Sequence, residues 1–89
     1  MSEKNFYQIV KRPVVTENTF DLIEDQNKLT FIVKREANKY QIKEAIQELF
    51  GVRVVKINTL ITSRGEKKAF VKLHINDSAA DLAIDLGIF

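Results

Sequence analysis

The chain has 89 residues, a formal net charge of +2 and no cysteine. This length predicts one domain over residues 1–89 and leaves little room for a deep catalytic cleft. The lack of cysteine excludes disulfides and thiolate metal sites. No apolar run approaches the roughly 18 residues of a membrane span, and the first residues do not resemble a signal peptide. We therefore expect a soluble, cytoplasmic protein that is not integral to a membrane.

The charges are divided unevenly along the chain. Residues 53–72 contain six basic residues and one acidic residue, and residues 28–43 contain five and one. Residues 17–25 and 77–85 contain acidic residues and no basic residue. The sequence therefore predicts a basic middle that attracts a polyanion and acidic flanks that do not.

The first third of the chain predicts two short elements and one half-buried strand. Residues 6–10 are compatible with a strand, and Pro13 interrupts regular structure after them. Thr16 is a suitable N-cap for a helix over residues 17–25. Apolar and polar residues then alternate over residues 29–34, which is the period of a strand.

The clearest element is an amphipathic helix that begins after Asn38. Asn38 is a suitable N-cap, and Gln41 stands at the position that completes a capping box. Gly51 is placed to end the helix in a left-handed conformation. Helical spacing predicts one buried stripe, formed by Ile42, Ala45, Ile46, Leu49 and Phe50.

The last third predicts a hairpin followed by a helix. Residues 52–61 form the first strand, whose apolar phase shifts near residues 54–55 and predicts a bulge or a twist there. Residues 63–66 form a short turn, and residues 67–75 form the return strand. Ser78 caps the final helix and Gly87 ends it, after which Ile88 and Phe89 are expected to cover apolar surface.

The order β-α-β-α-β-β-α predicts an α+β fold, a small sandwich with a mostly antiparallel four-stranded sheet and helices. The strand–helix–strand unit over residues 27–60 should place its two strands parallel to each other. The last strand can then lie between them, antiparallel to both.

No group of residues in the sequence predicts catalysis. His74 is the only histidine, so a pair of histidine metal ligands is excluded. The three glycines (Gly51, Gly65 and Gly87) are isolated and form no phosphate-binding loop. We therefore expect no enzymatic activity, no cofactor, no metal and no small-molecule substrate.

Nucleic-acid binding is better supported, because basic and amide residues lie at the ends of adjoining elements. Such side chains neutralise phosphates and bond to sugar and phosphate oxygens. Residues 67–73 resemble the central strand of an RNA-recognition motif, but Lys68 replaces its first stacking aromatic residue. The pattern thus favours phosphate and shape recognition of structured RNA over base stacking on the sheet. The alternative interpretation is a solvated basic surface.

Seven blocks occur in order over nearly the whole chain: residues 12–17 (RPVVTE), 27–33 (NKLTFIV), 37–39 (ANK), 42–45 (IKEA), 49–52 (LFGV), 55–60 (VKINTL) and 67–73 (KKAFVKL). Together they resemble the universal family of large-subunit ribosomal protein twenty-three. The short turn at residues 63–66 and the lack of a long basic N-terminal extension resemble its archaeal form.

The resemblance implies a structural component of the large ribosomal subunit that binds large-subunit rRNA near the polypeptide exit tunnel. It implies as partners ribosomal protein twenty-nine, the signal recognition particle and the protein-conducting channel. The rRNA contacts that it implies are Arg12, Lys34, Arg35, Asn38, Lys39, Lys56, Asn58, Thr59, Lys67, Lys68 and Lys72. The acidic helices are expected to face away from the RNA. The alternative function is that of a small ferredoxin-like regulatory or protein-interaction domain.

Overall fold

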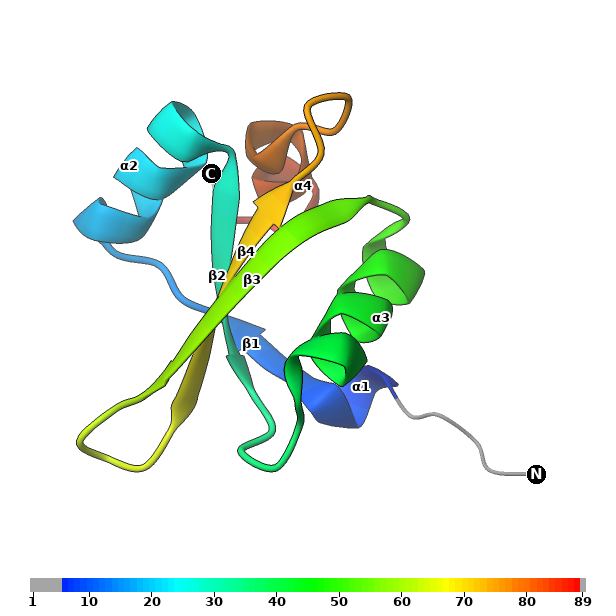
Figure 1. The fold of residues 1–89 in the computed structure, drawn as a ribbon. Coiled ribbons are helices and arrows are strands. Elements are labelled where there is room, and N and C mark those ends of the chain that lie inside the picture. Colours follow the sequence, from blue (N-terminus) through cyan, green and yellow to red (C-terminus); the bar gives the residue numbers. More distant parts are fainter. Residues whose placement is uncertain (1–5, 89) are drawn as a thin grey trace.

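The computed structural model describes residues 6–88, which form a four-stranded sheet and four helices (Figure 1). In chain order the elements are α1 (Phe6–Ile9), β1 (Val10–Pro13), α2 (Glu17–Gln26), β2 (Lys28–Val33), α3 (Lys39–Phe50), β3 (Val54–Ile61), β4 (Lys67–Leu73) and α4 (Ala79–Asp85). The predicted α+β class is therefore confirmed.

The strand order in the sheet is β1-β2-β4-β3, and every neighbouring pair is antiparallel. Because β2 and β3 both run antiparallel to β4 between them, they are parallel to each other. This confirms the predicted position of the last strand. The β2–α3–β3 unit can be followed in Figure 1 from cyan to green, with α3 lying beside β3.

The predicted bulge lies in β3. Val54 pairs with Leu73 and Lys56 pairs with Lys72, so Val55 is the extra residue between two consecutive partners. The side chain of Val55 is 53% exposed as a result. The pairing beyond the bulge places Ile57 opposite Val71, on the buried side. The extra residue restores the apolar phase of the strand.

Helix α3 begins and ends where the sequence predicts. Asn38 Oδ1 accepts a hydrogen bond from the backbone N–H of Gln41 at 2.8 Å, and Gln41 Oε1 accepts one from the N–H of Asn38 at 2.9 Å. This reciprocal pair is the predicted capping box. Gly51 ends the helix with φ of 66°, in the left-handed conformation that glycine adopts without strain.

One hydrophobic core lies on a single face of the sheet. It contains Ile23 from α2, Ile42 and Ile46 from α3, and Leu82 and Ala83 from α4. The strands contribute alternate residues to the same cluster: Leu29, Phe31, Val33, Val54, Ile57, Ala69, Val71 and Leu73. Since α2, α3 and α4 all join this cluster, they cover the same face. We call the opposite side the open face.

The segment at residues 6–10 differs from the expectation of a strand. Phe6–Ile9 is helix α1, which packs on α3, and the strand begins only at Val10. Pro13 lies within β1, where it pairs with Phe31. A proline fits there because β1 is an edge strand, in which alternate N–H groups face away from the sheet.

The remaining helix ends follow the sequence with one addition. Thr16 caps α2, and Thr19 completes a capping box that the sequence analysis did not identify. Ser78 caps α4, Gly87 follows its end with φ of 78°, and Ile88 packs against the core. Phe89 lies outside the described residues. Within residues 6–88, no helix has the length and hydropathy that crossing a bilayer requires.

Candidate nucleic-acid interface

Cross-strand pairing brings three lysines together on the open face. Lys72 in β4 pairs with Lys28 in β2 on one side and with Lys56 in β3 on the other. We call these three residues the lysine rung. Directly opposite side chains in a sheet lie about 5 Å apart at Cβ, and like charges at that spacing repel one another. A polyanion bound across the rung would relieve this repulsion.

Further residues extend the basic surface along the open face. Lys68 and Arg12 pair with Ile32 from its two sides, and Asn58 pairs with Phe70. These residues alternate with core residues along their strands, so they share the face of the lysine rung. Phe70 is only half-buried, whereas Ile32 is 3% exposed. The open face is therefore a basic surface with a small apolar centre.

The two layers of the molecule carry opposite charge. The four strands contain no acidic residue and seven basic residues: Lys11, Arg12, Lys28, Lys56, Lys67, Lys68 and Lys72. Helices α2 and α4 contain no basic residue and six acidic residues: Glu17, Asp21, Glu24, Asp25, Asp81 and Asp85. Because α2 and α4 cover the opposite face, the acidic flanks of the chain lie on the side away from the lysine rung. Helix α3 on that same side has two lysines and two glutamates.

Arg12 is an open-face cation that has an ion-pair partner among residues 6–88. Its Nη2 lies 3.1 Å from Oε2 of Glu66, which belongs to the turn between β3 and β4. Both side chains are largely accessible, at 57% and 38%. An exposed pair of this kind contributes little to stability. A phosphate could therefore displace Glu66 from Arg12 at a small cost.

The residues at one end of the sheet have a different role. Lys67 faces the opposite side from Lys68, and its Nζ donates to the carbonyl oxygens of Ala37 at 2.6 Å and of Arg35 at 3.5 Å. These bonds hold the β2–α3 loop against the start of β4. Arg35 extends to the hairpin turn. A Cβ atom at position 65, which glycine lacks, would lie 3.5 Å from Arg35 Nη1. Lys34 is exposed in the same loop.

The eleven predicted RNA contacts therefore do not form one patch. Thr59 pairs with Ala69 and so faces the covered side. Asn38 and Lys39 lie at the start of α3, and Asn38 Oδ1 already accepts the hydrogen bond of the helix cap from the N–H of Gln41. Three residues lie at the loop end of the sheet (Lys34, Arg35 and Lys67), and five share the open face: Arg12, Lys56, Asn58, Lys68 and Lys72.

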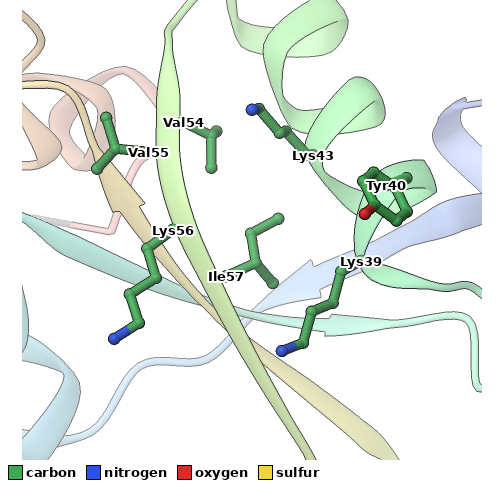
Figure 2. Close-up of a pocket in the computed structure, with 7 residues that line it drawn as sticks. All are labelled: Lys39, Tyr40, Lys43, Val54, Val55, Lys56 and Ile57. Carbon is green, nitrogen blue, oxygen red and sulfur yellow. The ribbon is translucent and has the colours of Figure 1, made fainter.

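A hollow between α3 and β3 adjoins this basic surface (Figure 2). Its volume is about 220 Å³, and its walls are Lys39, Tyr40, Lys43, Val54, Val55, Lys56 and Ile57. The sequence analysis did not select Lys28, Tyr40 or Lys43 as contacts. The alternation of side chains along β2 could have identified Lys28 as a residue of the open face. The nearness of Tyr40 and Lys43 to β3 depends on how α3 packs, which the sequence does not show.

Comparisons with known proteins identify the family to which the chain belongs. Residues 8–80 match the family model described as Ribosomal protein L23. The chain is 48% identical to the large ribosomal subunit protein uL23 of Methanobrevibacter smithii over 83 residues, which cover 93% of this chain and 96% of the relative. It is 46% identical to the uL23 of Methanococcus vannielii over the same shares of both chains. Both relatives are archaeal, which agrees with the resemblance of the short turn at residues 63–66 to the archaeal form of the family. The chain belongs to the ribosomal protein L23 family.

Proposed function

We propose that this chain is a non-catalytic structural component of the large ribosomal subunit and binds large-subunit rRNA through its open face. The observation that carries the proposal is the lysine rung, in which Lys28, Lys72 and Lys56 stand side by side across three strands. Three adjacent ammonium groups can neutralise the closely spaced phosphates of a folded RNA.

The open face supports recognition of the backbone and shape of the RNA. Its charged side chains are lysines and one arginine, which contact phosphates without reading the base sequence. Arg12, Lys68 and Asn58 extend the surface around the rung. Of the other predicted contacts, Lys34 and Arg35 at the loop end are accessible to the same RNA.

We place the chain near the polypeptide exit tunnel, on cytoplasmic ribosomes, as the resemblance to its family implies. The acidic helices α2 and α4 lie on the face away from the lysine rung, which leaves them accessible to proteins. We propose that ribosomal protein twenty-nine adjoins the chain, and that the signal recognition particle and the protein-conducting channel dock on this acidic side.

RNA binding is tested by measuring the affinity of the purified chain for a large-subunit rRNA fragment at several salt concentrations. The logarithm of the binding constant should fall steeply against the logarithm of salt, by roughly 0.9 for each phosphate neutralised on a duplex. The double variant Lys56→Gln/Lys72→Gln should bind more weakly, and its slope should be smaller by about two.

The control is the double variant Asp81→Asn/Asp85→Asn, which alters the net charge by the same amount on the acidic side. We expect its affinity and salt slope to match those of the wild type, because these residues are exposed on the covered face. Equal and opposite effects of the two double variants would show that net charge alone acts. Weak, salt-independent binding by the wild type would instead support a regulatory or protein-interaction domain.

Docking on the acidic side needs a separate measurement on assembled ribosomes. Reversal of Asp81 and Asp85 to lysine should weaken binding of the signal recognition particle while leaving assembly of the chain into the subunit unchanged. Unaltered binding of the particle by that variant would contradict a docking role for α4.

A further inference from the structure

The hollow between α3 and β3 combines an exposed aromatic ring with positive charge. Tyr40 is 85% exposed, although it is a large and partly apolar side chain on an ordered helix. Lys39 and Lys43 flank it, and Lys56 lies across the hollow on β3 (Figure 2). None of the seven residues that line the hollow is acidic. An anionic occupant is therefore favoured.

The floor of the hollow is apolar and already buried. Val54 and Ile57 are 4% and 7% exposed, and their side chains point from β3 toward α3 in Figure 2. Val55 also belongs to the lining, and in Figure 2 its side chain leaves β3 on the side opposite Val54, where it adds accessible apolar surface at the edge of the strand. A flat, partly apolar group could thus lie against Tyr40 and the edge of β3, while its charged part remains near the lysines.

We propose that this hollow binds a single unstacked nucleotide of the rRNA, with its base stacked on Tyr40. Lys39 and Lys43 then hold the phosphates on either side of that nucleotide. Unpaired bases in loops and bulges are commonly bound in this way, by stacking on an aromatic ring beside positive charge. The proposal rests on the rRNA binding proposed above and adds a base-contacting site on α3.

Continuity with the open face favours RNA over an acidic peptide. Lys56 lines the hollow and is also a member of the lysine rung. In Figure 2 its side chain leaves β3 on the side opposite Ile57, toward the open face. One RNA chain can therefore cross the rung and place the next unpaired nucleotide in the hollow. A short acidic peptide would fill the hollow without using the rung.

The test compares three substitutions at Tyr40 in the full chain, with binding to the large-subunit rRNA fragment as the readout. Tyr40→Ala should lower the affinity by about 5- to 100-fold, the range that base stacking on one aromatic ring supports. Tyr40→Leu keeps apolar bulk without a ring and should lose most of the same affinity. Tyr40→Phe keeps the ring and should bind within about twofold of the wild type.

The salt dependence separates stacking from charge. Tyr40→Ala should leave the salt slope unchanged because it removes no charge, whereas Lys43→Gln should lower the slope by about one. Chemical probing of the RNA should show one unpaired base that the wild type and Tyr40→Phe protect and Tyr40→Ala does not. Thermal unfolding of each variant checks the fold, which the high exposure of Tyr40 should leave intact.

Two outcomes would overturn the inference. If Tyr40→Ala binds the RNA as well as the wild type while Lys56→Gln/Lys72→Gln binds weakly, the proposed function stands and the nucleotide site does not exist. If Tyr40→Ala instead abolishes binding of a synthetic peptide of alternating glutamate and leucine and leaves RNA binding intact, the hollow is a peptide site. Failure of the wild type to bind the RNA would reject both proposals.

Discussion

The two faces of the sheet use the same strands for different purposes. On the covered face, alternate residues such as Leu29 and Val71 are at most 1% exposed and pack against three helices. On the open face, the alternate residues Lys28 and Lys72 pair across the same two strands and remain partly accessible. The core residues of the covered face therefore serve stability and the lysines of the open face are available for binding, so substitutions in these two sets should affect different properties.

This comparison also separates polar residues that hold the fold from polar residues that are available to a partner. Asn27, Asn38 and Lys67 bond to the chain itself. Lys56 and Lys68 lie on the open face, and within residues 6–88 neither side chain makes a hydrogen bond that holds the fold. For these five residues, type and charge alone do not distinguish the two groups, but hydrogen-bond partners do. Lys72 belongs to both groups, since its Nζ donates to the carbonyl oxygen of Gln26 at 3.4 Å.

The largest effect is expected from Ile46→Ala in the covered layer. Ile46 is fully buried in α3, so its truncation leaves a cavity and should lower the free energy of unfolding by about 2–5 kcal/mol. Lys68→Ala on the open face should change it by at most about 0.5 kcal/mol. Urea unfolding of both variants measures the difference. Similar losses in the two variants would contradict the separation of the faces, and Ile46→Val serves as a milder variant if Ile46→Ala does not fold.

A smaller effect is expected at Asn27, which joins the α2–β2 turn to the β4–α4 loop. Its Nδ2 donates to the carbonyl of Asp77 at 2.9 Å, and its Oδ1 accepts from the N–H of Ala79 at 2.7 Å. Its φ of 54° is left-handed, which alanine adopts at a cost of about 1–2 kcal/mol. Asn27→Ala should therefore lower the free energy of unfolding by about 2–4 kcal/mol.

The control at this position is Asn27→Gly, which tolerates the left-handed backbone but lacks the side-chain bonds. Its loss of stability should be smaller than that of Asn27→Ala. Equal losses in the two variants would show that backbone conformation contributes nothing at this site.

A loss of about 1 kcal/mol is expected for Asn38→Ala, which removes the N-cap of α3. Asn38→Ser should restore most of the stability, because serine also caps helices well. Thermal unfolding measures both. Asn38 was also predicted as an RNA contact. The rRNA affinity of Asn38→Ser tests whether its side chain binds RNA in addition to capping α3. Wild-type affinity would assign Asn38 to the fold alone, and a marked loss would assign it to the RNA as well.

The smallest effect is expected for Thr30→Val. The Thr30 hydroxyl is buried and has no hydrogen-bond partner among the described residues. Replacing it with a methyl group removes an unsatisfied polar atom, so the free energy of unfolding should stay level or rise by up to about 1 kcal/mol. Chemical denaturation measures this change. A loss above 1 kcal/mol would indicate that the hydroxyl bonds to ordered water.

The sequence predicted most of the fold because the main elements carry strong local signals. Helix α3 has an N-cap and a terminal glycine that the structure confirms. Of its predicted apolar stripe, Ile42, Ala45 and Ile46 are buried, whereas Leu49 and Phe50 are half-buried. The bulge at Val55 was predicted from a shift in apolar phase, and the pairing confirms it. The strand predicted at residues 6–10 was wrong, because a four-residue segment has little preference of its own and takes its form from packing on α3.

The candidate site was predicted less completely. Sequence grouped Lys67 with Lys68 as neighbouring contacts, but adjacent residues of a strand face opposite sides, and Lys67 bonds to the β2–α3 loop. It also did not select Lys28, which completes the lysine rung only through pairing with Lys72. Nothing in the sequence singled out Tyr40. Its place beside β3 depends on the packing of α3, which no local pattern predicts.

The sequence by itself determined the secondary-structure elements of the β2–α3–β3 unit, because they follow from local periodicity and capping residues. It also determined the uneven charge along the chain, and its short hairpin connection predicted that β4 lies between β2 and β3. Only the tertiary structure decided which charges share a face. Strand pairing brought Lys28, Lys56 and Lys72 together from distant segments, and the shared core placed the acidic helices on the other side. Contacts between distant segments depend on register and packing, which no local pattern specifies.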